Sequence, residues 1–284
     1  MENEVSSPRR WAIDVSRVLR EVFGNDRFPV PVEQVAREFS VAKYPDDPIS
    51  LIHGSSLSGF EGGLFKDPEG HKGWAIIYNS DITSPGRINF TLAHEFGHYL
   101  VHRARYPEGI QCTQKDMAGW GSEYERIERE ANEFAAWLLM PLDDFRRQID
   151  SDHMPSLDEL GTCAERYGVS LMAAILRWLD YTKQRAVLVL SRDNYVLWAR
   201  SSRPALRSGA FIRTKHQPPV PIPTSSLAAE RNQGSVERST KVHDEGVWFQ
   251  ERCIETALAS DTYEFTLSLI QLRVATGLGV QGEV

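Results

Sequence analysis

The sequence contains few cysteines and no long hydrophobic run. Its three cysteines, Cys112, Cys163 and Cys253, are odd in number and far apart, which argues against a disulfide framework and for a reducing compartment. No apolar run approaches the roughly 20 residues that a membrane-spanning helix needs. The N-terminal stretch MENEVSSPRRWAIDV also lacks the apolar core of a secretory signal. We therefore expect a cytoplasmic protein with no membrane partner.

Charge is distributed unevenly along an otherwise ordinary globular composition. The 284 residues are 41% hydrophobic and 25% charged, and such a length is enough for two domains with a core each. The formal net charge is −7, yet residues 181–241 hold eleven Lys/Arg against three Asp/Glu, a local charge of +8 against −15 elsewhere. A basic segment therefore lies within an acidic chain that shows no internal repeats.

Hydrophobic spacing predicts helices over most of the first 182 residues. Residues 9–23 and 31–41 have amphipathic helical spacing, and Ser84 and Pro85 can open a helix that continues beyond residue 98. A long helix is expected at 122–140, and two short helices broken at Gly168 are expected within 156–183. The exceptions are two strands, GGLFK and GWAIIYN, and a loop at 104–121.

Strands dominate the predicted structure after residue 184. The segments with strand character are RAVLVLS, YVLWARS, AFIRT and YEFTLSLIQLRV. A Pro-rich segment and a polar stretch separate the last two. The whole chain is therefore predicted to be α+β.

The segment NFTLAHEFGHYLVHR, residues 89–103, places two histidines one helical turn apart. His94 and His98 can reach one metal ion, and Glu95 lies about 100° around the helix, where a carboxylate can polarise a metal-bound water. Gly97, unfavourable in a helix, indicates the close approach of another element. The pattern fixes only three positions, so a core helix with two hydrogen-bonded histidines is the competing interpretation. His102 is expected to contact a ligand or face the substrate.

A third ligand is expected from the helix at 122–140, which carries several glutamates. Glu128 lies on the same face as Ala131 and Ala135, whereas Glu130 lies about 200° away and points outward. A carboxylate on an apolar face is costly unless it is paired or bound to a metal. Glu128 is therefore the predicted ligand, and Asn132, four residues on, can hold it.

Two further motifs extend this pattern to a family. RINFTLAHEFGHYLVHR followed by EREANEFAAWLLMP resembles the ImmA/IrrE family of bacterial zinc metallopeptidases, and GWAIIYN matches the strand that the family places before the helix. Together the motifs cover residues 73–141. Within the family we expect the branch of CapP-like proteins from anti-phage operons. The motifs themselves indicate the family and do not distinguish its branches.

The resemblance implies a reaction, a substrate and a signal. It implies Zn²⁺ held by His94, His98 and Glu128, with Glu95 as general base in peptide-bond hydrolysis. GWAIIYNS can offer an edge to an extended substrate, and Tyr99, His102 and Tyr124 are candidates for a second oxyanion donor. The implied substrate is a helix-turn-helix repressor, cleaved after DNA damage to derepress a stress- or phage-defence operon.

Three domains follow from these patterns. We expect a mostly helical zinc metallopeptidase domain with a small sheet at 1–148, a helix-turn-helix-like segment at 149–182 and a strand-rich α+β sensor domain at 183–284. The resemblance makes that last domain GAF-like. The middle segment leaves open a non-proteolytic DNA-binding regulator with a structural zinc site, although its second helix offers a single base-reading cation, Arg177.

Regulation by a thiol and by single-stranded DNA is also expected. Cys112 lies between the ligand helices, where its thiolate can take the open zinc position; an incidental loop thiol is the alternative. Cys163 and Cys253 are expected in helical core patterns. Cations beside aromatic rings favour the binding of single-stranded DNA. The alternatives are that these cations form an ordinary solvated face, or that the domain senses a small ligand in a GAF-like pocket. The residues concerned are Arg192, Arg200, Arg203, Arg207, Arg213, Lys215 and Trp198.

Overall fold

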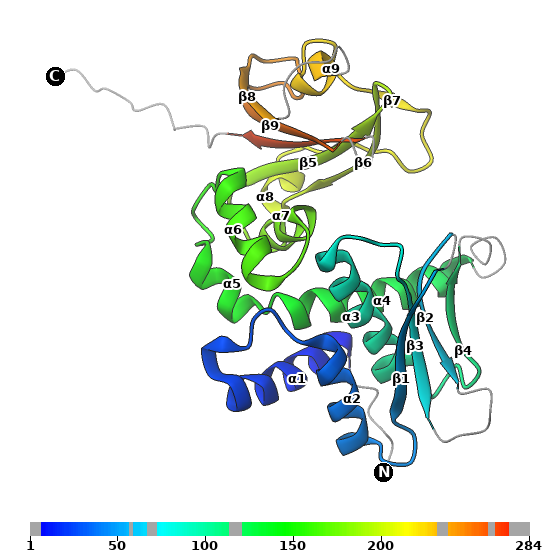
Figure 1. Ribbon diagram of the computed structural model, residues 1–284. Helices are drawn as coiled ribbons and strands as arrows, with labels where there is room; N and C mark the ends of the chain where they lie inside the picture. The colour runs from blue at the N-terminus through cyan, green and yellow to red at the C-terminus, as the bar shows by residue number, and fades with distance from the viewer. Residues whose placement is uncertain are drawn as a thin grey trace. The chain divides into compact units, whose positions relative to one another are not determined.

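The chain is α+β and divides into two compact units (Figure 1). The computed structural model describes residues 7–56, 59–66, 73–113, 121–231, 238–260 and 265–272. One unit comprises Met1–Phe145 and Gly161–Ala174, and the other comprises Arg146–Leu160 and Ile175–Val284. Residues of the helical segment expected at 149–182 contribute to both units. The division into three domains stays a prediction.

Two helices open the first unit, as the sequence predicts. α1 (Pro8–Phe23) is capped by Ser7, whose side chain accepts a hydrogen bond from the Arg10 backbone N–H. The 3₁₀ turn η1 (Gly24–Asp26) leads towards α2 (Val32–Lys43). α1 packs on the later helix α4 (Gly121–Leu139), and Arg9 lies 4.4 Å from the ring of Trp137 there.

A four-stranded sheet follows, with the order β1-β3-β2-β4. The strands are β1 (Ile49–Ser55), β2 (Phe60–Lys66), β3 (Trp74–Asn79) and β4 (Gly109–Thr113). β2 and β3 confirm the predicted GGLFK and GWAIIYN strands, but β4 falls inside the expected loop because Ile110 pairs with Leu64 of β2. β3 lies between β1 and β2, so the expectation that it offers a free edge to a substrate is wrong.

The helix α3 (Pro85–His102) lies against β2 and β3 and packs along α4. Ser84 is the N-cap residue of α3, but its side chain makes no capping hydrogen bond. Pro85 lies at the start of the helix, as predicted. α5 (Leu142–Gln148), α6 (Leu157–Tyr167) and α7 (Leu171–Leu179) follow. Gly168, with φ +60°, separates α6 from α7 as predicted.

The second unit is built on a six-stranded antiparallel sheet with the order β7-β6-β5-β10-β9-β8. The elements are β5 (Arg185–Arg192), β6 (Tyr195–Ser201), α8 (Arg203–Arg207), β7 (Val220–Pro221), α9 (Leu227–Arg231), β8 (Arg238–His243), β9 (Cys253–Ser260) and β10 (Phe265–Leu272). The strand predicted at AFIRT is wrong, since Ala210 donates its N–H back to Ala205 of α8. Cys163 is a buried helical residue as expected, whereas Cys253 lies in β9.

A buried carboxylate holds the second unit together. Glu255 is fully buried and accepts hydrogen bonds from the backbone N–H groups of Leu227 and Ala228, from Trp248 Nε1 and from Ser268 Oγ. His243 Nε2 lies 2.8 Å from the same carboxylate. The buried carboxyl oxygens thereby find hydrogen-bond partners within the unit. No helix in the described part of the chain is long and apolar enough to cross a membrane.

Candidate metal centre

Helix α3 places two imidazoles and a carboxylate in the core of the first unit. His94, Glu95 and His98 are all buried. The two histidines are one turn apart, and their Nε2 atoms lie 2.9 Å from each other. The strand β2 covers Glu95: a Cβ built on Gly62 would lie 3.0 Å from Glu95 Oε1. Gly62 thus permits the close approach of β2 to this carboxylate.

Helix α4 brings the third group, Glu128, to the same point. Its carboxylate oxygens lie 3.4 Å from His94 Nε2 and 3.2 Å from His98 Nε2. The helices come this close because α3 has Gly97 where they meet: a Cβ there would lie 2.9 Å from the buried Phe134 ring. The expectation that another element approaches Gly97 is confirmed. Ligand atoms of His94, His98 and Glu128 all lie within 4.8 Å of one another.

Outer contacts orient each imidazole. His94 Nδ1 lies 3.0 Å from Asn132 Oδ1, so a proton on Nδ1 leaves Nε2 as an acceptor. His98 Nδ1 lies 3.1 Å from His102 Nδ1, and His102 Nε2 lies 2.9 Å from Glu130 Oε2. One tautomer assignment satisfies this chain: His98 donates to His102, which donates to Glu130. It leaves the Nε2 lone pair of His98 facing Glu128.

The arrangement therefore fits a cation. Two imidazole lone pairs and a carboxylate face one another, which is unfavourable in a buried site unless a positive charge lies between them. The outer partners fix the tautomers that a metal requires, and two imidazoles with one carboxylate are a donor set of catalytic zinc sites. A core helix with two merely hydrogen-bonded histidines would not need the Glu128 carboxylate at this point.

The titration behaviour of the three groups has the same origin. Burial lowers the pKa of His98 to about 3, so this imidazole is neutral, as a metal ligand must be. Burial acts against ionisation of Glu128 too, but hydrogen bonds to His94 and His98 outweigh it and hold its pKa below the ordinary value. Burial also acts to lower the pKa of His94, yet the carboxylates of Glu128 and Glu95 raise it overall.

The outer residues differ partly from the sequence predictions. Asn132 contacts His94 rather than Glu128. Glu130, expected to point outward, is half-buried and contacts His102. Both ring nitrogens of His102 are engaged, which excludes it as an oxyanion donor. Tyr99 is excluded as well, because it is buried and its hydroxyl donates to the Asp47 carbonyl. Glu130 belongs to the EREANEFAAWLLMP motif, but the facing of residues on an isolated helix did not predict its contact with His102.

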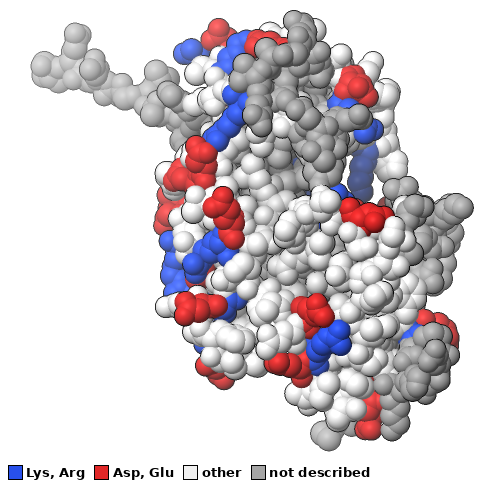
Figure 2. Space-filling view, viewed as in Figure 1, with Lys and Arg blue, Asp and Glu red and all other residues white. Residues whose placement is uncertain are grey.

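The remaining predicted residues lie apart from this cluster in the sequence. Cys112 belongs to β4 rather than a loop, and its side chain lies outside the described residues. The cations Arg192, Arg200, Arg203, Arg207, Arg213 and Lys215 are exposed, and Trp198 is half-buried. Arg200 lies 3.5 Å from Asp180, and Arg213 lies 5.2 Å from the Phe211 ring. Acidic and basic side chains are interspersed on the face drawn in Figure 2.

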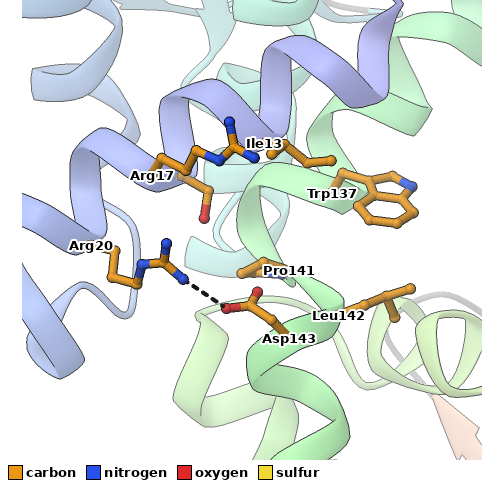
Figure 3. Close-up of a pocket in the computed structure, with 8 residues that line it drawn as sticks. Ile13, Arg17, Arg20, Trp137, Pro141, Leu142 and Asp143 are labelled. Atoms are coloured by element: carbon orange, nitrogen blue, oxygen red, sulfur yellow. Dashed lines mark ion pairs between the residues drawn. The ribbon is translucent and has the colours of Figure 1, made fainter.

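A separate hollow of about 290 Å³ lies between α1 and the junction of α4 with α5. Figure 3 shows Arg17 and Arg20 of α1 on one side and Trp137 and Pro141 on the other. Arg20 lies 3.8 Å from Asp143 across it. None of the three candidate metal ligands lines this hollow. It is therefore not the cleft of the metal centre.

Comparison with known families places this geometry in context. Residues 52–179 match the family model Peptidase_M78, described as the IrrE N-terminal-like domain. The match begins in β1 and ends with α7, so it includes His94, Glu95, His98 and Glu128. No curated protein matches the chain significantly.

Proposed function

We propose that this protein, whose residues 52–179 belong to the IrrE N-terminal-like family of metallopeptidases, is a zinc-dependent endopeptidase. The observation that carries the proposal is the convergence of His94, His98 and Glu128 within 4.8 Å in the core. These three side chains would hold the metal. Zinc bound there supplies Lewis acidity toward a water molecule and a peptide carbonyl.

Glu95 is the general base in this proposal. It is buried beside His94, whose pKa its charge helps to raise, and under Gly62 of β2. A carboxylate in this position accepts a proton from the attacking water and returns it to the leaving amine. The burial of Glu95 keeps bulk water from competing for that proton.

The outer residues act through the imidazoles. Asn132 holds His94 by a hydrogen bond at Nδ1. His102 holds His98 in the same way, and Glu130 in turn holds His102. Such contacts fix ring orientation and raise the basicity of the nitrogen that faces the metal. We assign these three residues a positioning role.

The proposed substrate is a helix-turn-helix transcriptional repressor, and the proposed operon is one of stress or phage defence, as in the CapP-like branch. The exposed cations of the second unit support activation by single-stranded DNA after DNA damage, because they accompany the aromatic side chains Tyr195, Trp198 and Phe211. Cys112 as an inhibitory fourth zinc ligand stays a proposal of the same kind.

A role as a DNA-binding regulator finds less support. The single cation of the second helix, Arg177, is only 2% exposed, and Trp178 on the same helix is fully buried. A recognition helix must present such side chains to the major groove. We therefore do not carry this alternative further.

Replacing Glu95 with Gln tests the reaction. The Glu95→Gln protein should keep its zinc, because Glu95 lies outside the ligand set, but should cleave at least roughly 100-fold more slowly. The measurement is repressor cleavage on co-expression with the repressor encoded beside its gene, with and without DNA damage. Zinc content of the purified proteins is measured in parallel.

Glu125→Gln is the matched control, because Glu125 is an exposed glutamate of α4. It should cleave like the wild-type protein. An intact repressor in the presence of wild-type, zinc-loaded protein under both conditions would show that the substrate is misassigned. Cleavage by the Glu95→Gln protein at the wild-type rate would show that the mechanism is wrong.

A further inference from the structure

An apolar groove lies between α1 and α2 in the first unit. Its volume is about 360 Å³. Val18, Val22 and Phe23 of its α1 wall are 47%, 66% and 39% exposed. The residues that line it are Val15, Val18, Leu19, Val22, Phe23, Gln34, Val35, Glu38, Phe39, Ala42 and Lys43.

The apolar surface of α1 is wider than its contact with the rest of the unit requires. Ala12, Val15 and Leu19 are buried, and they form the stripe expected for a helix that packs on α4. Val18 and Val22 continue this apolar surface around the helix into solvent. Large exposed apolar patches are uncommon on monomers and mark sites of association.

The groove carries charges of opposite sign. Among the described residues that line it, two are charged, Glu38 and Lys43, and both are exposed residues of α2. Counted along the sequence, Glu38 and Lys43 are equally far from the midpoint between residues 40 and 41. The large residue Phe39 and the small residue Ala42, which line the same wall, are also equally far from that midpoint.

We propose that this groove is the interface of a two-fold symmetric dimer, with its axis crossing α2 midway along the helix between residues 38 and 43, on the face that carries Phe39 and Ala42. Antiparallel α2 helices then place Glu38 opposite Lys43 of the second copy, and Phe39 opposite Ala42 of the second copy. Each pair forms twice, as two-fold symmetry requires. Opposite charges and complementary sizes therefore meet around one axis, and Val22 and Phe23 of both copies are covered.

None of the candidate metal ligands lines the groove. Phe39 contacts Phe96 of α3, with ring centroids 6.1 Å apart, and Phe96 is two positions from His94, on the other side of that helix. The groove therefore lies on the side of α3 that faces away from the candidate ligands. The proposal is independent of the proposed peptidase activity, and its test needs no substrate.

The test is the mass of the full-length protein in solution, by sedimentation velocity over a range of concentrations. Wild-type protein should approach twice the 32.2 kDa of one chain. Val22→Glu, which brings two carboxylates into the interface, should weaken the dimer at least roughly 100-fold. Val41→Glu is the control: Val41 is 54% exposed on α2 but does not line the groove, so this variant should stay dimeric.

A charge exchange tests the axis itself. Glu38→Lys and Lys43→Glu should each raise the dimer Kd by roughly 2- to 30-fold, because each change removes two surface ion pairs. The double variant should restore wild-type affinity, since the pairs form again with reversed sign. A monomer at every concentration, or a dimer indifferent to Val22→Glu, would overturn the proposal. So would single charge variants that the double variant does not rescue.

Discussion

Each histidine of the candidate metal centre is oriented by residues that lie outside the ligand cluster. Asn132 fixes the tautomer of His94, and Glu130 fixes that of His98 through His102. Glu128 and Glu130 are two residues apart on one helix but have different roles, because the first faces both Nε2 atoms and the second faces only His102. The two glutamates therefore form a matched pair for mutagenesis.

We predict that Glu128→Ala loses stoichiometric zinc, because it removes one of three ligands. Glu130→Ala should keep zinc but bind it roughly 10- to 100-fold more weakly, since it removes only the partner of His102. The measurement is zinc affinity by competition with a chromophoric chelator. If Glu130→Ala loses its zinc and Glu128→Ala retains it, the assignment of Glu128 as the metal ligand is wrong.

The contact between α3 and α4 decides whether the ligands meet. Gly97 and Phe134 set this distance, since a Cβ at residue 97 would overlap a ring that is fully buried. The helix propensity of glycine is poor, so its presence in α3 reflects packing rather than local preference. Gly62 has the same relation to Thr91, where a Cβ would lie 2.5 Å from Thr91 Cγ2.

We predict that Gly97→Ala destabilises the first unit. Overpacking costs about 1–3 kcal/mol against a gain in helix propensity of roughly 1 kcal/mol, so we expect a net loss of up to about 2 kcal/mol, and zinc affinity should fall with it. Gly161→Ala in α6 is the control, since no atom lies within 4 Å of a Cβ there, and should stabilise by roughly 0.5–1 kcal/mol. Urea unfolding measures both. Equal stability of the two variants would contradict the packing argument.

At the scale of the whole molecule, the basic segment and the candidate metal ligands belong to different units. The basic segment 181–241 belongs to the second unit, whereas the candidate metal centre lies in the first. Several of its arginines lie near acidic residues, as Arg200 does near Asp180, so part of the local charge is neutralised. Binding to a nucleic acid must therefore displace these pairs or use the remaining cations.

We predict that reversing Arg200, Arg203 and Arg207 to Glu weakens binding of a labelled oligothymidylate at least roughly 10-fold. The slope of log K against log salt should fall by about 2, for three lost phosphate contacts. Reversal of Lys183, Arg238 and Arg252, which changes charge equally at exposed sites outside the predicted set, is the control. Binding and DNA-stimulated cleavage that are unchanged in the first triple variant would refute the nucleic-acid proposal.

The sequence by itself determined the elements that local periodicity specifies. Helical spacing predicted α1, α2, α3 and α4, and it placed His94 and His98 on one side of α3 and Glu128 on the inward face of α4. Residues three or four apart on a helix share a face whatever surrounds them. The break at Gly168 was equally local, because glycine alone adopts that backbone conformation freely.

Only the tertiary structure decided which distant groups meet. β4 exists because β2 pairs with it, and β3 is central rather than free for the same reason. The partner of Asn132 is His94, 38 residues away, and the partners of Glu255 come from α9, β8, β10 and the segment before β9. These contacts depend on how strands order and helices cross, which side-chain periodicity along one segment does not specify.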